Sequence, residues 1–100
     1  GSLAAARVAV VIPCYRVREH ILGVLDSVPA EVASVYVVDD ACPEATGDEV
    51  LARCGDPRVK VIRNPVNLGV GGAVMAGYRQ AIADGQRTAK AVVAALTKAS

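Results

Sequence analysis

Three short, nearly continuous apolar runs rich in β-branched residues limit most strongly what this chain can fold into. They are Val8–Ile12, Val35–Val38 and Val59–Ile62. Runs of this kind are typical of strands that are buried on both faces, as in a parallel sheet. Helical patterns follow each run, and strands that alternate with helices favour right-handed crossover connections. We therefore predict a single α/β domain with a three-stranded parallel sheet in the order β-α-β-α-β-α.

The segments between the runs carry the helical patterns. Apolar residues recur at helical spacing from Val17 to Val28 and again from Val70 to Ala83. Between them, Thr46 and Glu49 have the spacing of a capping box, which predicts that a short helix begins there.

The C-terminal stretch differs from the rest of the chain because it is rich in alanine and follows a helix directly. Ala89, Val92, Val93 and Leu96 stand at the spacing of one helix face. We therefore predict an extra amphipathic helix over residues 86–100, within one domain that spans residues 1–100.

Composition excludes several classes of function. Eleven basic and ten acidic residues give a net charge of +1, so no basic surface for a nucleic-acid partner is indicated. No apolar run approaches the roughly 18 residues that cross a bilayer, and Leu3–Arg7 is too short for a signal peptide. A cytoplasmic location is expected. The three cysteines include no Cys-x-x-Cys pair, which indicates neither a disulfide framework nor a zinc site.

Polar residues follow each predicted strand, where an open parallel sheet binds its ligands. These residues are Pro13–Tyr15, Asp39–Asp40 and Asn64–Gly72. Two adjacent carboxylates after a buried strand need donors or cations around them, and a nucleotide supplies base N–H groups and ribose hydroxyls. The alternative is that one aspartate caps the next segment while the other is solvated.

The other two polar features also allow two interpretations. Tyr15 either stacks on a base or is an aromatic residue at the edge of the core. Asn67–Gly72 is either a phosphate cradle at a helix N-terminus or a tight turn with close helix packing. It lacks the Gly-Lys-Ser/Thr ending of a P-loop and the spacing of a dinucleotide fingerprint. The only histidine, His20, completes no catalytic triad.

Three segments together resemble the ordered motifs of the family 2 glycosyltransferases. They are VAVVIPCYR (Val8–Arg16), VYVVDDACPEAT (Val35–Thr46) and VIRNPVNLGVGGAVMAGYRQAIADG (Val61–Gly85). The similarity is greatest to the dolichol-phosphate mannose synthase-like branch. It implies that residues 7–85 form the nucleotide-binding, Rossmann-like half of a GT-A fold.

The resemblance also implies a role for particular residues. A nucleotide-diphosphate sugar of the UDP or GDP type would be the donor. The residues after the first strand would line the site of its base, and the paired aspartates would contact its base or ribose. The turn after the third strand would have a mainly structural role. The implied substrate-binding residues are Pro13, Tyr15, Asp39, Asp40, Asn67 and Gly69. No catalytic residue is implied.

Several positions depart from the family pattern. Arg16 and Val17 stand where members often carry Asn-Glu, and Ala41 replaces a glycine after the paired aspartates. The family continues into a fourth strand ending in Asp-x-Asp, which holds a divalent metal, and then into a half that supplies the acceptor site and the catalytic base. This chain has no Asp-x-Asp. We therefore expect donor-site elements but no metal or other cofactor here, and no transfer by this chain alone.

The missing strand also leads to an expectation about assembly. The outer edge of the first strand would be unpaired and apolar. We therefore predict either that two chains form a homodimer through this edge or that the C-terminal helix covers it. Two other functions remain open: a non-catalytic nucleotide-binding module, and a structural, self-associating α/β fragment.

Overall fold

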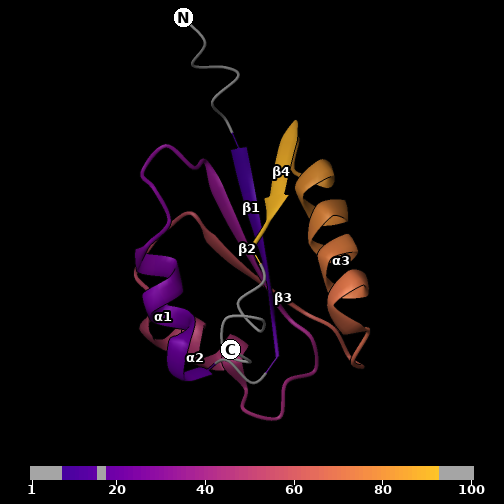
Figure 1. The fold of residues 1–100 in the computed structure, drawn as a ribbon. Helices are drawn as coiled ribbons and strands as arrows, with labels where there is room; N and C mark the ends of the chain where they lie inside the picture. Colours follow the sequence, from indigo (N-terminus) through magenta and orange to yellow (C-terminus); the bar gives the residue numbers. More distant parts are fainter. Residues whose placement is uncertain (1–7, 16–17, 93–100) are drawn as a thin grey trace, which may run out of the picture.

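Strands and helices alternate along the whole described part of the chain (Figure 1). The structure is a computed structural model that describes residues 8–15 and 18–92. In chain order its elements are β1 (Val8–Cys14), α1 (Arg18–Asp26), β2 (Ser34–Asp39), α2 (Thr46–Arg53), β3 (Val59–Arg63), α3 (Gly69–Ala83) and β4 (Thr88–Ala91).

The strands form one parallel sheet in the order β3-β2-β1-β4. Helices α1 and α2 cover one face of this sheet and α3 covers the other (Figure 1). Alternate residues of β1 therefore enter two different cores: Ile12 packs with Ile21 of α1, and Val11 packs with Ala73 of α3. Burial on both faces explains why the apolar runs are continuous rather than alternating. The parallel α/β fold is as predicted from the sequence.

Helix α3 lies very close to the sheet because small residues face it. Ala73, Gly77 and Ala81 are buried, and a Cβ added at Gly77 would overlap Cγ1 of Val11. Because these small residues recur at four-residue spacing, they lie on one face of α3 and allow its backbone to approach the sheet closely.

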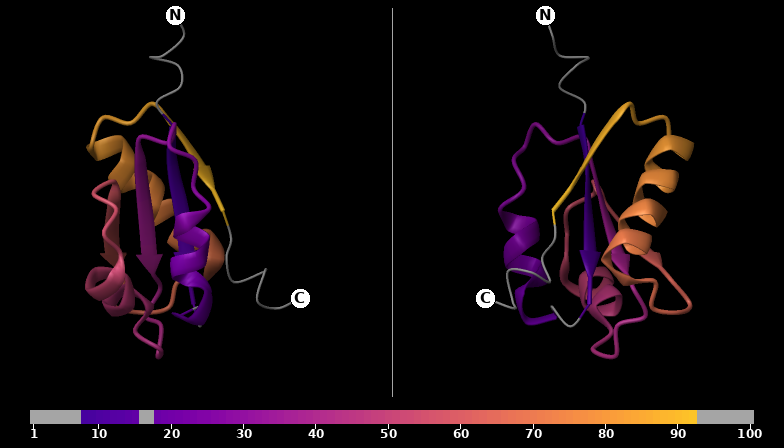
Figure 2. Two further views of the ribbon diagram at one scale, coloured as in Figure 1. Left: turned by 90° about the vertical axis from the view of Figure 1, so that its left-hand side faces the viewer. Right: turned by 45° about the vertical axis from the view of Figure 1, so that its right-hand side comes forward.

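The prediction of three strands and of a helix that includes residues 88–91 is wrong. Thr88–Ala91 forms β4, which pairs with Val8–Val11 of β1 (Figure 2). The unpaired backbone groups of β1 offer this segment hydrogen bonds that outweigh the helical preference of its alanines. Residues 93–100, the remainder of the predicted helix, lie outside the described residues.

The pairing of β1 with β4 also removes the basis of the predicted dimer. The edge of Val8–Val11 that we expected to be open is occupied by β4. Dimerisation itself stays an untested prediction. In the described ranges, no helix is long and apolar enough to cross a membrane.

Candidate functional site

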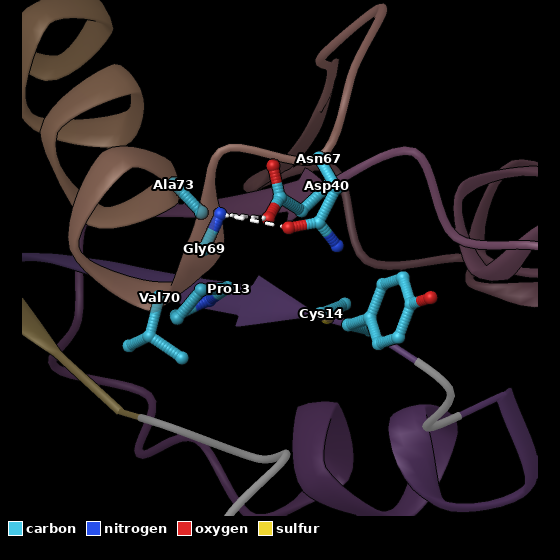
Figure 3. Close-up of a pocket in the computed structure, with 8 residues that line it drawn as sticks. Pro13, Cys14, Asp40, Asn67, Gly69, Val70 and Ala73 are labelled. Atoms are coloured by element: carbon cyan, nitrogen blue, oxygen red, sulfur yellow. Dashed lines mark hydrogen bonds between the residues drawn. The ribbon is translucent and has the colours of Figure 1, made fainter.

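A cavity of about 210 Å³ lies beyond the carboxyl ends of β1 and β2, beside the start of α3 (Figure 3). Its lining residues are Pro13, Cys14, Tyr15, Asp40, Asn67, Gly69, Val70 and Ala73. Five of the six residues that the sequence singled out therefore meet in one cavity. Asp39, the sixth, is not part of the lining.

Asp39 is buried and directed at helix α2 instead. Its Oδ1 accepts the backbone N–H of Cys42 at 2.9 Å and its Oδ2 accepts that of Gly47 at 2.8 Å. The N-cap residue of α2, Ala45, has no side-chain capping bond of its own. The carboxylate of Asp39 therefore satisfies a free donor at the start of α2 and complements the positive end of the helix.

The predicted capping box of α2 is consequently wrong. Thr46 lies inside the helix rather than at its N-cap, and its buried hydroxyl lies 3.2 Å from Sγ of Cys42. The spacing of Thr46 and Glu49 fitted the capping pattern, but a carboxylate from the preceding strand occupies the place where a local cap would act.

Asp40 performs the equivalent task for helix α3. Its Oδ1 accepts the backbone N–H of Leu68 at 2.9 Å. Its Oδ2 accepts the backbone N–H of Gly69, also at 2.9 Å (Figure 3). The amide of Asn64 adds a third hydrogen bond, from Nδ2 to Oδ1, at 2.8 Å. Leu68 is the N-cap of α3 and makes no side-chain cap. The negative carboxylate at this helix start disfavours the phosphate-cradle interpretation, because it would repel a phosphate there.

The two adjacent aspartates thus point to different helices. Together their carboxylates accept five protein hydrogen bonds, which accounts for the burial of both despite their like charge. The alternative of one capping and one solvated aspartate is only half right, because both cap a helix and neither is exposed. A carboxylate has about four acceptor positions, so Asp40, which lines the cavity, retains one of them, on Oδ2.

Cys14 contributes a neutral thiol to the cavity wall. It is 1% exposed, and its Sγ lies 3.4 Å from the carbonyl oxygen of Ile12. Burial, followed by the negative charge of Asp39 and the neighbouring Cys42, raises the pKa of the Cys14 thiol to about 12. The thiol is therefore protonated at neutral pH and is a poor nucleophile.

Two alanines in the loop between β2 and α2 adopt the left-handed backbone conformation that glycine usually provides. Ala41 has a φ of 57° and Ala45 a φ of 54°. An L-residue with a Cβ pays roughly 1–2 kcal/mol for this conformation. The turn is therefore strained at Ala41 and Ala45, where glycine would adopt the same φ without this steric cost.

Asn64, which holds Asp40 from the end of β3, belongs to the polar segment Asn64–Gly72 that the sequence placed at this edge, but it was not among the six residues expected to bind substrate. The available signal was the dipeptide Asn64-Pro65, because a residue before proline is restricted to extended backbone. His20, by contrast, is exposed on α1 and does not line the cavity.

The fold defines a Rossmann-like α/β protein, and its cavity lies at the carboxyl edge of the parallel sheet, where proteins of this class bind their ligands. Residues 9–94 match the sequence model of glycosyl transferase family 2, and the chain belongs to this family. The resemblance seen in the three motifs is thereby confirmed, and the matched region includes β4.

The chain is similar to the undecaprenyl-phosphate mannosyltransferase of Micrococcus luteus. That relative is 44% identical to this chain over 78 residues. The aligned region covers 73% of this chain and 31% of the relative, so the chain spans about a third of the relative's length.

Proposed function

We propose that this chain is the donor-nucleotide part of a glycosyltransferase that transfers a sugar from a nucleotide-diphosphate sugar of the UDP or GDP type to an acceptor. The observation that carries the proposal is the cavity at the carboxyl ends of β1 and β2, which gathers Tyr15, Asp40 and Asn67. The mannosyltransferase relative supports a mannosyl donor and a polyprenyl-phosphate acceptor.

The chemistry of the cavity wall suits a base and part of a ribose. The remaining acceptor position of Asp40 can take one N–H or O–H group, and the ring of Tyr15 offers a surface for stacking. Val70 and Ala73 supply apolar contact on the α3 side. A volume of about 210 Å³ is below the roughly 300–1,000 Å³ of complete ligand pockets. The diphosphate and sugar would therefore extend beyond it.

The divalent metal expected for complete family domains does not fit the residues described here. Among residues 8–15 and 18–92, no group of three His, Cys, Asp or Glu side chains is placed to hold a metal ion. The carboxylates of Asp39 and Asp40 already accept backbone N–H groups. We accordingly propose that this stretch binds the donor nucleotide and that sugar transfer needs residues beyond it.

Nucleotide titration followed by NMR tests this proposal. GDP-mannose and UDP-glucose are added to the ¹⁵N-labelled chain, and we expect shifts at Tyr15, Asp40 and Asn67. Replacing Tyr15 by alanine should weaken binding about 5- to 150-fold, since stacking on a base contributes roughly 1–3 kcal/mol. The absence of any shift with either nucleotide at millimolar concentration would contradict the proposal and favour a structural fragment.

A further inference from the structure

We propose that Asn64 is a positioning residue of this site, which orients the carboxylate of Asp40 so that one oxygen stays available to the cavity. The inference rests on the proposed function for the nature of the ligand. The orientation of Asp40 itself does not depend on that proposal.

The backbone of Asn64 places its side chain for this task. Its N–H donates to the carbonyl oxygen of Asp39 at 2.9 Å, which ties the end of β3 to the end of β2. Pro65 confines Asn64 to extended backbone. The side-chain amide of Asn64 then donates a hydrogen bond of 2.8 Å to Oδ1 of Asp40, the residue that follows β2.

The other donors to Asp40 come from a different direction. Leu68 and Gly69 approach from the start of α3, whereas Asn64 approaches from the end of β3. Rotation about the Cβ–Cγ bond of an aspartate is soft, because this torsion has no narrow staggered minima. Donors from two elements hold the carboxylate plane more firmly than the α3 donors alone. Without Asn64, only the N–H groups of Leu68 and Gly69 would hold the carboxylate, so its orientation at the cavity would be less firmly fixed.

Few charged and titratable groups surround Asp40 in the described part of the chain. Asp39 precedes Asp40 in the chain, but its carboxylate points to α2. Cys14 and Tyr15 come from the end of β1 and line the cavity. Arg63 precedes Asn64, and its guanidinium pairs with Asp48 of α2. The first turn of α3 carries no acidic residue. None of these groups is a histidine. If a second carboxyl is introduced at position 64, the pair that it forms with Asp40 is therefore expected to account for a change in protonation between pH 5.0 and 7.5.

The decisive variant is Asn64→Asp, which keeps the size of the side chain and replaces the donor by a carboxylate. At pH 7.5 two carboxylates face each other, and at pH 5.0 a shared proton restores the hydrogen bond. We expect the dissociation constant for GDP-mannose or UDP-glucose, whichever the wild type binds, to rise about 10- to 100-fold at pH 7.5. Most of this loss should be recovered at pH 5.0.

Gln80→Glu is the matched control. The amide of Gln80 donates to Asp84 at 3.0 Å on the exposed C-terminal part of α3, so the same chemical change is made away from the cavity. This variant should bind as the wild type does at both pH values. If Asn64→Asp also binds like the wild type at pH 7.5, or loses the same affinity at both pH values, the positioning role is wrong.

Hydrogen exchange in the free wild-type protein tests the inference without nucleotide and without a substitution. One side-chain amide proton of Asn64 should exchange at least tenfold more slowly than those of the exposed Asn67. Equal exchange rates would overturn the inference. If the wild type binds neither nucleotide, the proposed function fails, and slow exchange at Asn64 still establishes that it holds Asp40.

Discussion

The carboxylate of Asp39, at the end of β2, accepts the backbone N–H of Gly47 at 2.8 Å at the start of α2. The contact is possible only because Gly47 has no side chain. A Cβ at this position would lie 2.8 Å from Oδ2 of Asp39 and 3.1 Å from Cγ1 of Val61. The first of the two adjacent aspartates is thereby committed to holding α2 on the sheet, and only the second reaches the cavity.

The replacement Asp39→Asn should lower the free energy of unfolding by about 1–3 kcal/mol, because a buried charged acceptor of two backbone N–H groups is lost. Urea denaturation at pH 7.5 measures the change. Asp48→Asn is the control, since Asp48 is 62% exposed and pairs with Arg63 at the surface, where such pairs contribute roughly 0–1 kcal/mol. Equal stability of the two variants would show that Asp39 does not cap α2.

The replacement Ala41→Gly should raise the free energy of unfolding by about 0.5–1 kcal/mol. Ala41 has a φ of 57°, and glycine adopts this conformation without steric cost, although part of the gain is lost to the greater freedom of glycine in the unfolded chain. Ala52→Gly, on the exposed face of α2, should lower stability by a similar amount. Thermal melts of both variants test the opposite signs, and destabilisation by Ala41→Gly would contradict the prediction.

The replacement Gly77→Ala should destabilise the protein by about 1–3 kcal/mol or more, since the added Cβ would overlap Cγ1 of Val11 in the middle of the sheet. Gly71→Ala lies in the first turn of the same helix, with no atom within 4 Å of the added Cβ. It should be neutral or stabilise by up to about 1 kcal/mol. Urea midpoints of the two variants measure the contrast, and similar midpoints would argue against close packing of α3 on β1.

Cys14 predicts a loss of stability at alkaline pH. Its pKa is raised from 9.0 to about 12, so the folded state retains a proton that the unfolded chain has released. The contribution of this bound proton to the free energy of unfolding is fully present below pH 9 and is lost as the pH rises towards 12. At pH 10.5 the decrease relative to neutral pH should reach about 2 kcal/mol for this one group.

Urea denaturation of the wild type and Cys14→Ala at pH 7.5 and 10.5 tests this prediction. The variant should show a smaller decrease between the two pH values, whatever its stability at pH 7.5. Tyr36 is present in both proteins, and burial together with its hydrogen bond to Asp84 raises its pKa to about 12 as well. A residual decrease in the variant is therefore expected, whereas an undiminished decrease would rule out the contribution of Cys14.

The positions of three strands and of the site could be predicted because local chemistry determines them. Apolar runs such as Val35–Val38 are stable only when both faces are covered, and this condition favours the interior of a parallel sheet. The carboxyl ends of parallel strands meet at one edge, so the convergence of Tyr15, Asp40 and Asn67 follows from the topology. The order of the three motifs along the chain is also enough to indicate the family, because each motif spans the end of one strand and the turn that follows it.

The tertiary structure alone decided the fourth strand and the division of work between the two aspartates. Thr88–Ala91 has a composition that suits a helix, and only the open edge of β1 makes it a strand. Asp39 and Asp40 are identical residues one position apart, and nothing local distinguishes them. Their roles differ because the start of α2 lies on one side of β2 and the start of α3 on the other, so each carboxylate meets the free N–H groups of a different helix.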